Sequence, residues 1–378
     1  MEHPRPLEGV VVVELGHSVA GPYAGLILAD LGARVIKVEN PKHGDYARDW
    51  GPPFWGDTSS AFASLNRGKE SLTVDFANPE EAAALRRLII EKADGVIQNL
   101  RPGILDTYGL SVESFRKQKP ALIWCDIGAF GAAGPMANKP GYDPLVQASS
   151  GIMSVTGEGD RPPVRVGISL VDMGSGMWAA MGFLASFIVR LKQGEGARIS
   201  TSLFETGLAW MTIPLAGFEA AGDVRKPYGS GVAEIVPYQA FQTRDGWLMI
   251  AAGNDNLFRK FCDVLGNGDL ATDPAFATNS ARVTNRERLI PIVAEAVARF
   301  DAQDLGGRLD ALGVPNSPLL GVRDVAHHPQ VKALDITAEC DDGLSLVSIP
   351  IAFDGVRPRA RRRAPKLGEH NVNFKGKT

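Results

Sequence analysis

Asp172 is the side chain in this sequence best placed to act as a nucleophile. It stands between a strand-like segment, Val164 to Leu170, and an apolar run that begins at Met173. At the start of a helix, amide N–H groups and the helix dipole would keep its carboxylate ionised and oriented. Such a carboxylate can attack a carbonyl carbon and form a covalent intermediate. The same position also suits a structural N-cap, and the residue types leave both interpretations open.

Glycines flank Asp172 on both sides. Gly167 precedes it, and Gly174 and Gly176 follow it. Because glycine has no Cβ, a bulky ligand could approach the backbone closely at these positions. The pattern is therefore compatible with a site at which Asp172 meets a large substrate, although position alone does not decide between this and the commoner structural N-cap.

Other catalytic motifs are missing from the sequence. No serine lies in a GxSxG elbow, and Cys125 has no evident base beside it. His327 and His328 are adjacent and would point to different faces, and neither HExxH nor HxH is present, so we expect no metal site. These observations count against serine, cysteine and metal-dependent chemistry.

The first strand-to-helix turn, residues 16–22, is the natural place for a phosphate or a dinucleotide. It lacks the GxGxxG nicotinamide fingerprint, because the next glycine after Gly16 is Gly21. Glu39 ends the following strand, where the ribose-binding acid of a nicotinamide enzyme would lie. A nicotinamide-dependent oxidoreductase is therefore a weak alternative, and the two glycines could simply shape a tight turn.

Strands alternate with helices along the first half of the chain. The β-branched run Val10 to Leu15 predicts a strand buried on both faces, and a helix from Tyr23 to Leu31 leads to a second strand, Arg34 to Glu39. This alternation predicts an α/β fold with an open, mostly parallel sheet. Further strands are expected near residues 71–75, 93–99, 122–127 and 198–203.

A second module is expected after residue 220. Gly, Pro, Ser and charged residues cluster at 221–231 and predict a linker. A hairpin near 240–251 and helices near 257–265, 285–298 and 302–312 follow it. Before the linker, Met173 to Leu191 is apolar on nearly every side and predicts a buried central helix.

Composition narrows the possible partners and the location. The 40 Lys+Arg against 43 Asp+Glu give a formal net charge of −3, which offers no reason to expect nucleic acid. The longest apolar stretch is shorter than the roughly 20 residues that span a bilayer, so we expect no membrane partner. A polar N-terminus and three unpaired cysteines favour a cytoplasmic location. The basic stretch Arg357 to His370 is expected to be a solvated surface, with docking of ligand phosphates or of an acidic partner surface as the alternative.

The sequence resembles the family III CoA-transferases, the CaiB–BaiF type, over almost its whole length. The resemblance implies an interlocked homodimer. Each chain would have a large Rossmann-like domain with an open parallel sheet, formed by residues 1–220 and 330–378, and a smaller α+β domain with linkers, residues 221–329. The motifs that carry the resemblance are residues 14–22, 30–39, 66–71, 94–103, 141–151, 167–173, 237–241, 273–276, 313–315 and 367–370.

The resemblance also implies that Asp172 is the nucleophile of a CoA-transferase. It would attack the thioester of a donor acyl-CoA, pass through an aspartyl–acyl anhydride and an aspartyl-CoA thioester, and return CoA to an acceptor carboxylic acid. Succinyl-CoA or another dicarboxylyl-CoA is the implied donor. CoA thioesters are then substrates, and no cofactor is bound permanently. The loop Gly229, Ser230 and Gly231 resembles the family's glycine-rich lid and would shield the intermediates.

The same resemblance implies a set of CoA contacts. Asn40 stands where relatives often carry Arg, and Thr107 stands near a position where they carry Lys or Arg. Arg101 or Lys139 is therefore expected to hold the phosphates instead. The implied contacts are Val19, Ala20, Asn40, Lys69, Asn99, Leu100, Arg101, Lys139 and Tyr142.

Two further functions fit the same fold. A 2-methylacyl-CoA racemase would remove an α-proton with a His/Asp pair, but Tyr142 lies in the block where those enzymes carry His. A non-catalytic CoA-binding protein is the other alternative. An Asp172→Ala substitution separates them, because a transferase would lose exchange and keep CoA binding.

Overall fold

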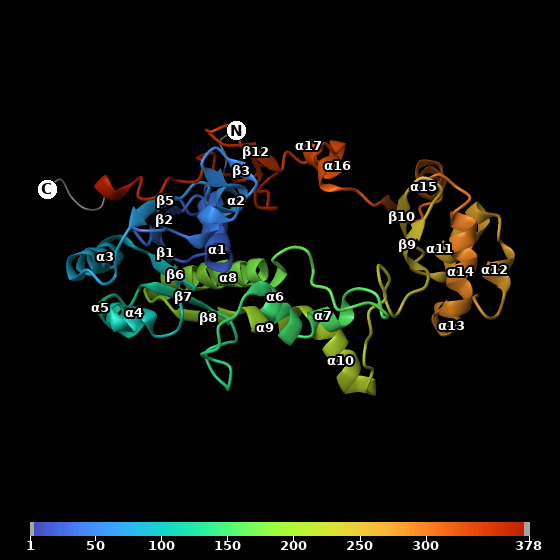
Figure 1. Ribbon diagram of the computed structural model, residues 1–378, viewed down its shortest axis with the longest axis horizontal. Coiled ribbons are helices and arrows are strands. Elements are labelled where there is room, and N and C mark those ends of the chain that lie inside the picture. The colour runs from blue at the N-terminus through green and yellow to red at the C-terminus, as the bar shows by residue number, and fades with distance from the viewer. Residues whose placement is uncertain (1–3, 374–378) are drawn as a thin grey trace. The chain divides into compact units, whose positions relative to one another are not determined.

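The structure, a computed structural model, describes residues 4–373 and divides them into two compact units (Figure 1). We call these the large unit and the small unit and describe each by itself. The domain boundaries expected at residues 220 and 329 concern segments that fold independently, and they stay a prediction. The large unit contains residues 4–152, 166–212 and 329–373, and the small unit contains residues 153–165 and 213–328.

The large unit is built on a six-stranded sheet in which every neighbouring pair of strands is parallel. Its order is β5-β2-β1-β6-β7-β8. The expected open parallel sheet of an α/β fold is thereby confirmed. The strands are β1 (Val11–Leu15), β2 (Arg34–Glu39), β5 (Glu70–Thr73), β6 (Gly95–Gln98), β7 (Ile123–Gly128) and β8 (Arg198–Ser202).

The strand order reverses beside β1. The chain runs from β1 outward to β2 and β5, and then returns to β6 on the other side of β1. In open α/β sheets, ligands bind outside the carboxyl ends of the strands at such a switch point. The turn after β1 and the turn after β6 therefore mark the expected ligand crevice.

Helices cover both faces of this sheet (Figure 1). The helices of the large unit are α1 (Ala20–Asp30), α2 (Ser60–Asn66), α3 (Pro79–Lys92), α4 (Ile104–Thr107), α5 (Val112–Gln118), α6 (Asp143–Ser149), α8 (Leu170–Gln193), α9 (Leu203–Trp210) and α17 (Pro329–Ala333). Its smaller elements are η1 (Tyr46–Asp49), η2 (Asn371–Asn373), β3 (Phe54–Trp55), β4 (Thr58–Ser59), β12 (Thr337–Glu339) and β13 (Ser345–Val347).

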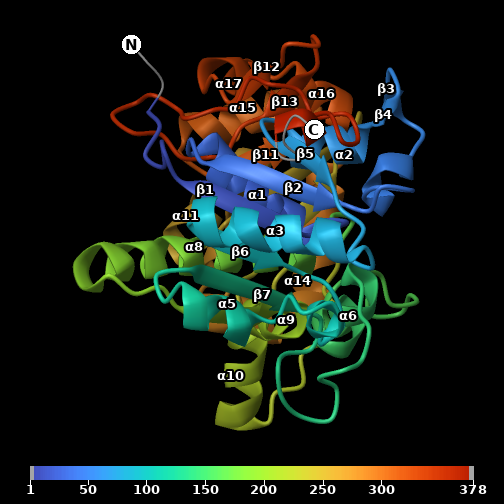
Figure 2. The same cartoon turned by 90° about the vertical axis from the view of Figure 1, so that its left-hand side faces the viewer.

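Alternating strand residues separate the two helical layers. Val13 and Trp124 pack with Leu85 of α3 and Phe115 of α5 in one buried core, and Figure 2 looks onto this layer. Glu14, the next residue after Val13, points to the opposite face and reaches α1. This second layer contains α1 and α8, which pack against each other.

Local sequence signals explain where several helices begin. The Asn78 side chain accepts a hydrogen bond from the Glu80 amide at 3.0 Å, and Pro79 opens α3, as the sequence predicts. α1 begins at Ala20, three residues before the predicted start. Pro22 lies within its first turn, where a missing amide proton costs no hydrogen bond.

The prediction that the long helix α8 is buried on all sides is wrong. One side packs on β7 and α1, while several large apolar residues of the other side are exposed in the unit taken by itself. By length and composition alone this helix could cross a membrane, although only 39% of its most apolar window is buried and core helices of soluble proteins pass the same test. The exposed residues are Met177, Trp178, Met181, Ile188, Val189 and Leu191.

The chain's basic C-terminal stretch closes one edge of the sheet. The His370 amide donates to Ser71 O at 3.0 Å, and the Thr73 amide donates to Asn371 Oδ1 at 2.9 Å. These bonds satisfy polar groups that an open edge strand, β5, would expose. Arg363 forms an ion pair with Glu369 at 2.8 Å. The stretch is therefore partly fixed against β5 rather than a freely solvated run.

The small unit is an α+β module. Its core lies between a three-stranded antiparallel sheet, ordered β11-β10-β9, and the helices beside it. The expected hairpin and three helices are present. The elements are β9 (Tyr238–Gln242), β10 (Trp247–Ala251), β11 (Asn316–Pro318), α11 (Asp255–Leu265), α12 (Asp269–Thr272), α13 (Asn279–Thr284), α14 (Arg286–Val297), α15 (Ala302–Ala311) and α16 (Val322–Ala326). Helices α7 (Ile152–Val155) and α10 (Thr212–Ala221) lie where the chain passes from one unit to the other.

Candidate active site

Asp172 lies inside the first turn of α8 and not at its N-cap. The helix begins at Leu170, and Ser169 occupies the N-cap position without a side-chain capping bond. The structural interpretation of Asp172 as the N-cap is therefore wrong. The helix starts earlier than predicted, so the carboxylate projects from the third helical residue.

A second carboxylate caps this helix instead. Asp143, the first residue of α6, is 3% exposed, and its Oδ1 accepts the Val171 amide at 2.8 Å and the Asp172 amide at 3.3 Å. Its Oδ2 accepts the Gln147 side-chain amide at 2.6 Å. Because Asp143 satisfies the helix amides, the Asp172 side chain is not needed for capping. Within the described part of the chain, the structure records no bond to the Asp172 carboxylate.

The surroundings make Asp172 more basic than an ordinary aspartate. Burial and then the neighbouring charge of Asp143 raise the pKa of Asp172 to about 7. The expectation that the helix start keeps this group strongly ionised is therefore wrong in direction, since Asp143 takes the amide donors. A carboxylate with this pKa is partly ionised at neutral pH and is a better nucleophile than a surface aspartate.

Two of the three glycines near Asp172 serve helix packing. A Cβ on Gly174 would lie 2.7 Å from Thr206 Cγ2 of α9, and one on Gly176 would lie 2.7 Å from Ala20 O of α1. Only Gly167 has open space around it, with nothing within 4 Å of an added Cβ. The expectation of close ligand approach therefore holds for Gly167 alone. The contact at Gly176 places Asp172, one turn earlier, beside the start of α1.

The turn that leads into α1 lies at the switch point of the sheet. The His17 amide donates to Asn99 Oδ1 at 2.9 Å, and Asn99 Nδ2 donates back to His17 O at 2.9 Å. These bonds join the turns that follow β1 and β6. Val19 then occupies the N-cap position of α1 without a side-chain capping bond. The first amides of α1 can therefore meet an anionic or carbonyl oxygen of a ligand.

A Gly176→Ala substitution should destabilise the large unit by about 1–3 kcal/mol, because the added methyl group would meet backbone atoms of α1. Those atoms, Ala20 O at 2.7 Å and Ala24 N at 3.1 Å, cannot rotate away. Thermal unfolding measures the effect. Gly182→Ala on the same helix is the control, since its methyl group would meet the Ile199 side chain at 2.8 Å and should cost less. Equal melting temperatures for the two variants would contradict this account of the helix contact.

Two cavities lie at the carboxyl edge of the sheet, and Leu100 lines both. One, of about 350 Å³, is bordered by His17, Asn40 and Tyr46. The other, of about 470 Å³, is bordered by Arg101. The structure thus brings Asn40, Leu100 and Arg101, three of the predicted CoA contacts, to the edge where ligands of open α/β sheets bind.

The other predicted contacts fall into different settings. Lys139 and Tyr142 are exposed on the segment that leads into α6, and the Lys139 ammonium lies 5.8 Å from the centre of the Phe130 ring. Val19 and Ala20 are buried at the start of α1, so their backbone amides are the groups available to a ligand.

Lys69 is placed differently from the expectation. Its side chain is fully buried, and its ammonium donates to Pro22 O at 2.7 Å and to Asn66 Oδ1 at 2.9 Å. It also pairs with Glu14 at 2.7 Å. An ammonium with all its donors engaged in the core does not reach a ligand, so the expected direct contact of Lys69 with CoA is not supported.

The predicted lid loop belongs to the small unit. The Gly229 amide donates to Gly157 O at 2.8 Å, and Ser230 Oγ accepts the Ala240 amide at 2.9 Å. Gly229 has φ +62°, a conformation that favours glycine. The loop is hydrogen-bonded to its neighbours in this structure, and its closure over a substrate stays a prediction.

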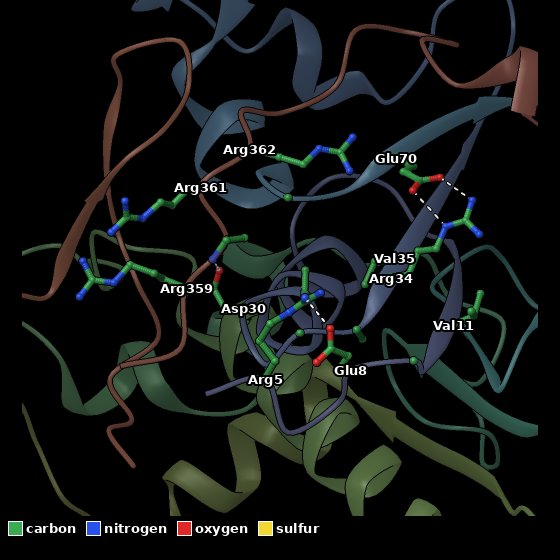
Figure 3. A pocket seen from close by; sticks show the side chains of 16 residues that line it. Arg5, Glu8, Val11, Asp30, Arg34, Val35, Glu70, Arg359, Arg361 and Arg362 are labelled. Atoms are coloured by element: carbon green, nitrogen blue, oxygen red, sulfur yellow. Dashed lines mark hydrogen bonds and ion pairs between the residues drawn. The ribbon is translucent and has the colours of Figure 1, made fainter. Parts of the chain in front are cut away.

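A further cavity, of about 530 Å³, lies at the opposite, amino edge of the sheet and is rich in arginine (Figure 3). Arg34 pairs there with Glu70 at 2.9 Å and Arg5 with Glu8 at 2.6 Å. It lies away from the switch point and holds none of the predicted site residues. Within residues 4–373, no three His, Cys, Asp or Glu side chains gather in a group that could hold a metal ion.

Sequence reasoning missed the part played by Asp143. Its motif, residues 141–143, is visible in the sequence, yet nothing local shows which amides Asp143 binds, because the Val171 amide is 28 residues away. The available signal was Gln147, four residues later on the same helix face, where it can hold the carboxylate.

Comparison with known proteins places this arrangement among enzymes. A family model described as CoA-transferase family III matches residues 7–371. Succinate–glutarate CoA-transferase of Agrobacterium fabrum is 39% identical, covering 97% of this chain and 94% of that protein, and acetyl-CoA:oxalate CoA-transferase of Acetobacter aceti is 37% identical with the same coverage. The crystal structure of a CaiB/BaiF family protein from Brucella suis superposes with a TM-score of 0.89 at 39% identity, covering 99% of both chains. The similarity thus extends over both units.

Proposed function

This chain belongs to CoA-transferase family III and transfers CoA between acyl-CoA thioesters and carboxylic acids, and from that premise we propose that Asp172 carries the transferred groups. The observation that supports this role is the division of labour between two carboxylates. Asp143 binds the amides of α8, and Asp172, in the same first turn, keeps a basic carboxylate without a recorded partner.

The proposed reaction begins with the donor. An Asp172 carboxylate oxygen attacks the thioester carbonyl, the C–S bond breaks, and an aspartyl–acyl anhydride and the CoA thiolate result. The thiolate then attacks the Asp172 carbonyl, which forms an aspartyl-CoA thioester and releases the donor as a carboxylate. The uncapped amides at the start of α1 are suited to stabilise the oxyanion of each tetrahedral intermediate.

The acceptor reverses these steps. Its carboxylate attacks the aspartyl-CoA carbonyl, giving a new anhydride and free CoA thiolate. The thiolate attacks the acceptor's acyl carbon, so the product thioester leaves and the Asp172 carboxylate is restored. Every C–S bond broken is formed again, and the thioester free energy is conserved. Exclusion of water is therefore essential, because hydrolysis of either intermediate would dissipate it.

The racemase alternative lacks support from this site. A racemase needs a His and an Asp to remove the α-proton. In the block where such enzymes carry the His, residues 141–143, this chain has Tyr142 beside Asp143. Asp143 is itself committed to three hydrogen bonds. The nicotinamide alternative is not supported either, because the similar proteins named above are CoA-transferases.

We propose dicarboxylic acids as the substrate class. Similar proteins carry names that include succinate, glutarate and oxalate. With succinyl-CoA as donor, glutarate or another short dicarboxylate should form its CoA thioester, whereas monocarboxylates such as butyrate should react at least about tenfold more slowly. Product masses from a panel of acids measure the preference. Faster transfer to monocarboxylates than to all dicarboxylates would overturn the proposed class while leaving CoA transfer intact.

We also propose that the enzyme is an interlocked homodimer. The exposed apolar side of α8, with the neighbouring Trp178–Trp210 ring pair at 6.1 Å, supports a second copy of this chain as the covering partner. Sedimentation equilibrium should give a mass of about twice 40.4 kDa. Met181→Glu, which places a charge on this side, should weaken the dimer, and a monomeric wild-type protein would contradict the proposal.

Three further expectations stay predictions: the cytoplasmic location, the phosphate contacts of Arg101 and Lys139, and the absence of a permanent cofactor.

A further inference from the structure

Four charged side chains lie buried beneath the first strand-to-helix turn, and the proposed chemistry uses none of them. Glu14, Lys37 and Lys69 are 0% exposed and Asp45 is 2% exposed. Lys37 lies 2.8 Å from both Glu14 and Asp45, and Lys69 lies 2.7 Å from Glu14. We call these four residues the turn cluster. Its two positive and two negative charges balance.

The turn cluster binds backbone atoms of the turn itself. Lys37 donates to Gly16 O at 2.8 Å, and Asp45 accepts the Ser18 amide at 2.9 Å. Lys69 donates to Pro22 O, in the first turn of α1, at 2.7 Å. Both ends of the turn and its middle are therefore held by charged side chains, while Asn99 holds His17 from the β6 side.

The local backbone is adapted to this arrangement. Ser18 has φ +66°, an unfavourable conformation for a residue other than glycine, and the Asp45 carboxylate holds its amide. In α1, a Cβ on Gly25 would overlap Glu14 Oε2, so a larger residue at this position would displace the carboxylate that pairs with Lys37 and Lys69. A strained residue and a glycine that leaves room for the Glu14 carboxylate thus accompany the same cluster.

Stability alone does not account for these charges. Moving ions out of water is expensive, and apolar side chains of similar volume are often as stabilising as a buried ion pair. What apolar side chains cannot do is bind Gly16 O, the Ser18 amide and Pro22 O at defined positions. The benefit specific to the charged residues is therefore the fixed shape of the turn.

We propose that Glu14, Lys37, Asp45 and Lys69 are positioning residues that hold the first strand-to-helix turn in the shape that receives the CoA thioester. This inference rests on the proposed function. The turn ends at the uncapped start of α1, and Gly176, one turn after Asp172, contacts Ala20 there. By fixing the turn, the cluster fixes the α1 amides relative to the nucleophile. Lys69 thus acts on CoA through the backbone rather than by direct contact.

A charge-balanced double substitution tests this role. Glu14→Gln with Lys69→Met removes the two ion pairs that Glu14 forms with Lys37 and Lys69, together with the bond to Pro22 O, and leaves the Lys37–Asp45 pair in place. The dissociation constant of free CoA, measured by calorimetry, should rise about tenfold. The KM for acyl-CoA should rise with it, and kcat should fall by a smaller factor.

The matched control removes a different buried pair from the same helix layer. Arg67 and Asp30 lie 2.5 Å apart at the C-terminal end of α1, far along the helix from the turn. Asp30→Asn with Arg67→Met should lower the melting temperature in the same way but leave CoA affinity within about twofold of wild type. Unchanged CoA affinity in the first double variant, or an equal loss in both, would overturn the positioning role.

A second pair of variants keeps the test decisive if the first double variant does not fold. Asp45→Asn retains an oxygen acceptor for the Ser18 amide, whereas Asp45→Ala deletes it. CoA affinity should fall more for alanine than for asparagine, and the reverse order would overturn the inference. Because free CoA binding requires no reaction at Asp172, these measurements remain valid if no acyl group is ever trapped there, an outcome that would reject the proposed function alone.

Discussion

Replacing Asp172 with alanine should reduce CoA exchange by about 10⁴-fold or more while CoA itself still binds. The reason is that both proposed covalent intermediates, the anhydride and the CoA thioester, are formed on this one carboxylate. Exchange is measured by the masses of the thioester products, and binding by calorimetry with free CoA. An alanine variant that still exchanged CoA at a rate near that of wild type would exclude the covalent mechanism at this residue.

Trapping locates the intermediate directly. Wild-type enzyme quenched with hydroxylamine during turnover should carry a hydroxamate at Asp172, found by peptide mapping, and the label at another residue would contradict the proposal.

Asp172→Asn supplies an isosteric control for folding. Because the folded state raises this pKa from 3.8 to about 7, it binds more protons than the unfolded state, and ionisation of Asp172 lowers stability as pH rises through that range. The asparagine variant should therefore be at least as stable as wild type at pH 8.

Replacing Asp143 with asparagine should move the acid limb of the pH dependence of kcat/KM to lower pH by about one unit. In the wild type this limb should lie near the Asp172 pKa of about 7, because the ionised carboxylate is the nucleophile. Asparagine keeps an oxygen that accepts the Val171 and Asp172 amides, and it removes the charge together with the acceptor for the Gln147 side-chain amide. The profile of kcat/KM between pH 5 and 9 measures the shift.

Asp143→Ala separates charge from position. It removes the charge and also the acceptor for the α8 amides at 2.8 and 3.3 Å, so the first turn that carries Asp172 loses its cap. We expect kcat to fall by about 10²-fold, because a displacement of the nucleophile by about 1 Å has an effect of this size. Identical pH profiles for wild type and Asp143→Asn would show that Asp143 does not act on the nucleophile through its charge.

Much of the fold is predictable because its signals are local. The run Val10 to Leu15 can hardly form anything except a buried strand, and Asn78 with Pro79 marks the start of α3 within the sequence itself. Asp172 stands out for the same reason, since a carboxylate at a strand-to-helix junction is visible without knowledge of the fold. These features depend on neighbouring residues alone.

The remaining features depend on contacts between distant segments. Asp143 reaches amides 28 residues away, and Lys69 is buried against Glu14 of another strand, so neither environment can be derived from the flanking sequence. The motif around Lys69 suggested a ligand contact, whereas the fold turns its ammonium into the core. The exposed side of α8 is equally hidden, because an apolar composition does not show whether the chain or a second molecule covers it.

The tail along β5 has a consequence for synthesis on the ribosome. Asp30, at the end of α1, accepts amides of Ile349 and Ala360, which are translated more than 300 residues later. During synthesis, the edge strand β5 is therefore uncovered and the Asp30 carboxylate lacks these two donors. Residues 213–328, in the small unit, are synthesised before the donors are made. A polypeptide terminated before residue 349 would leave the edge strand β5 permanently unpaired. We therefore expect truncated products to aggregate readily and to be bound by chaperones or degraded by proteases.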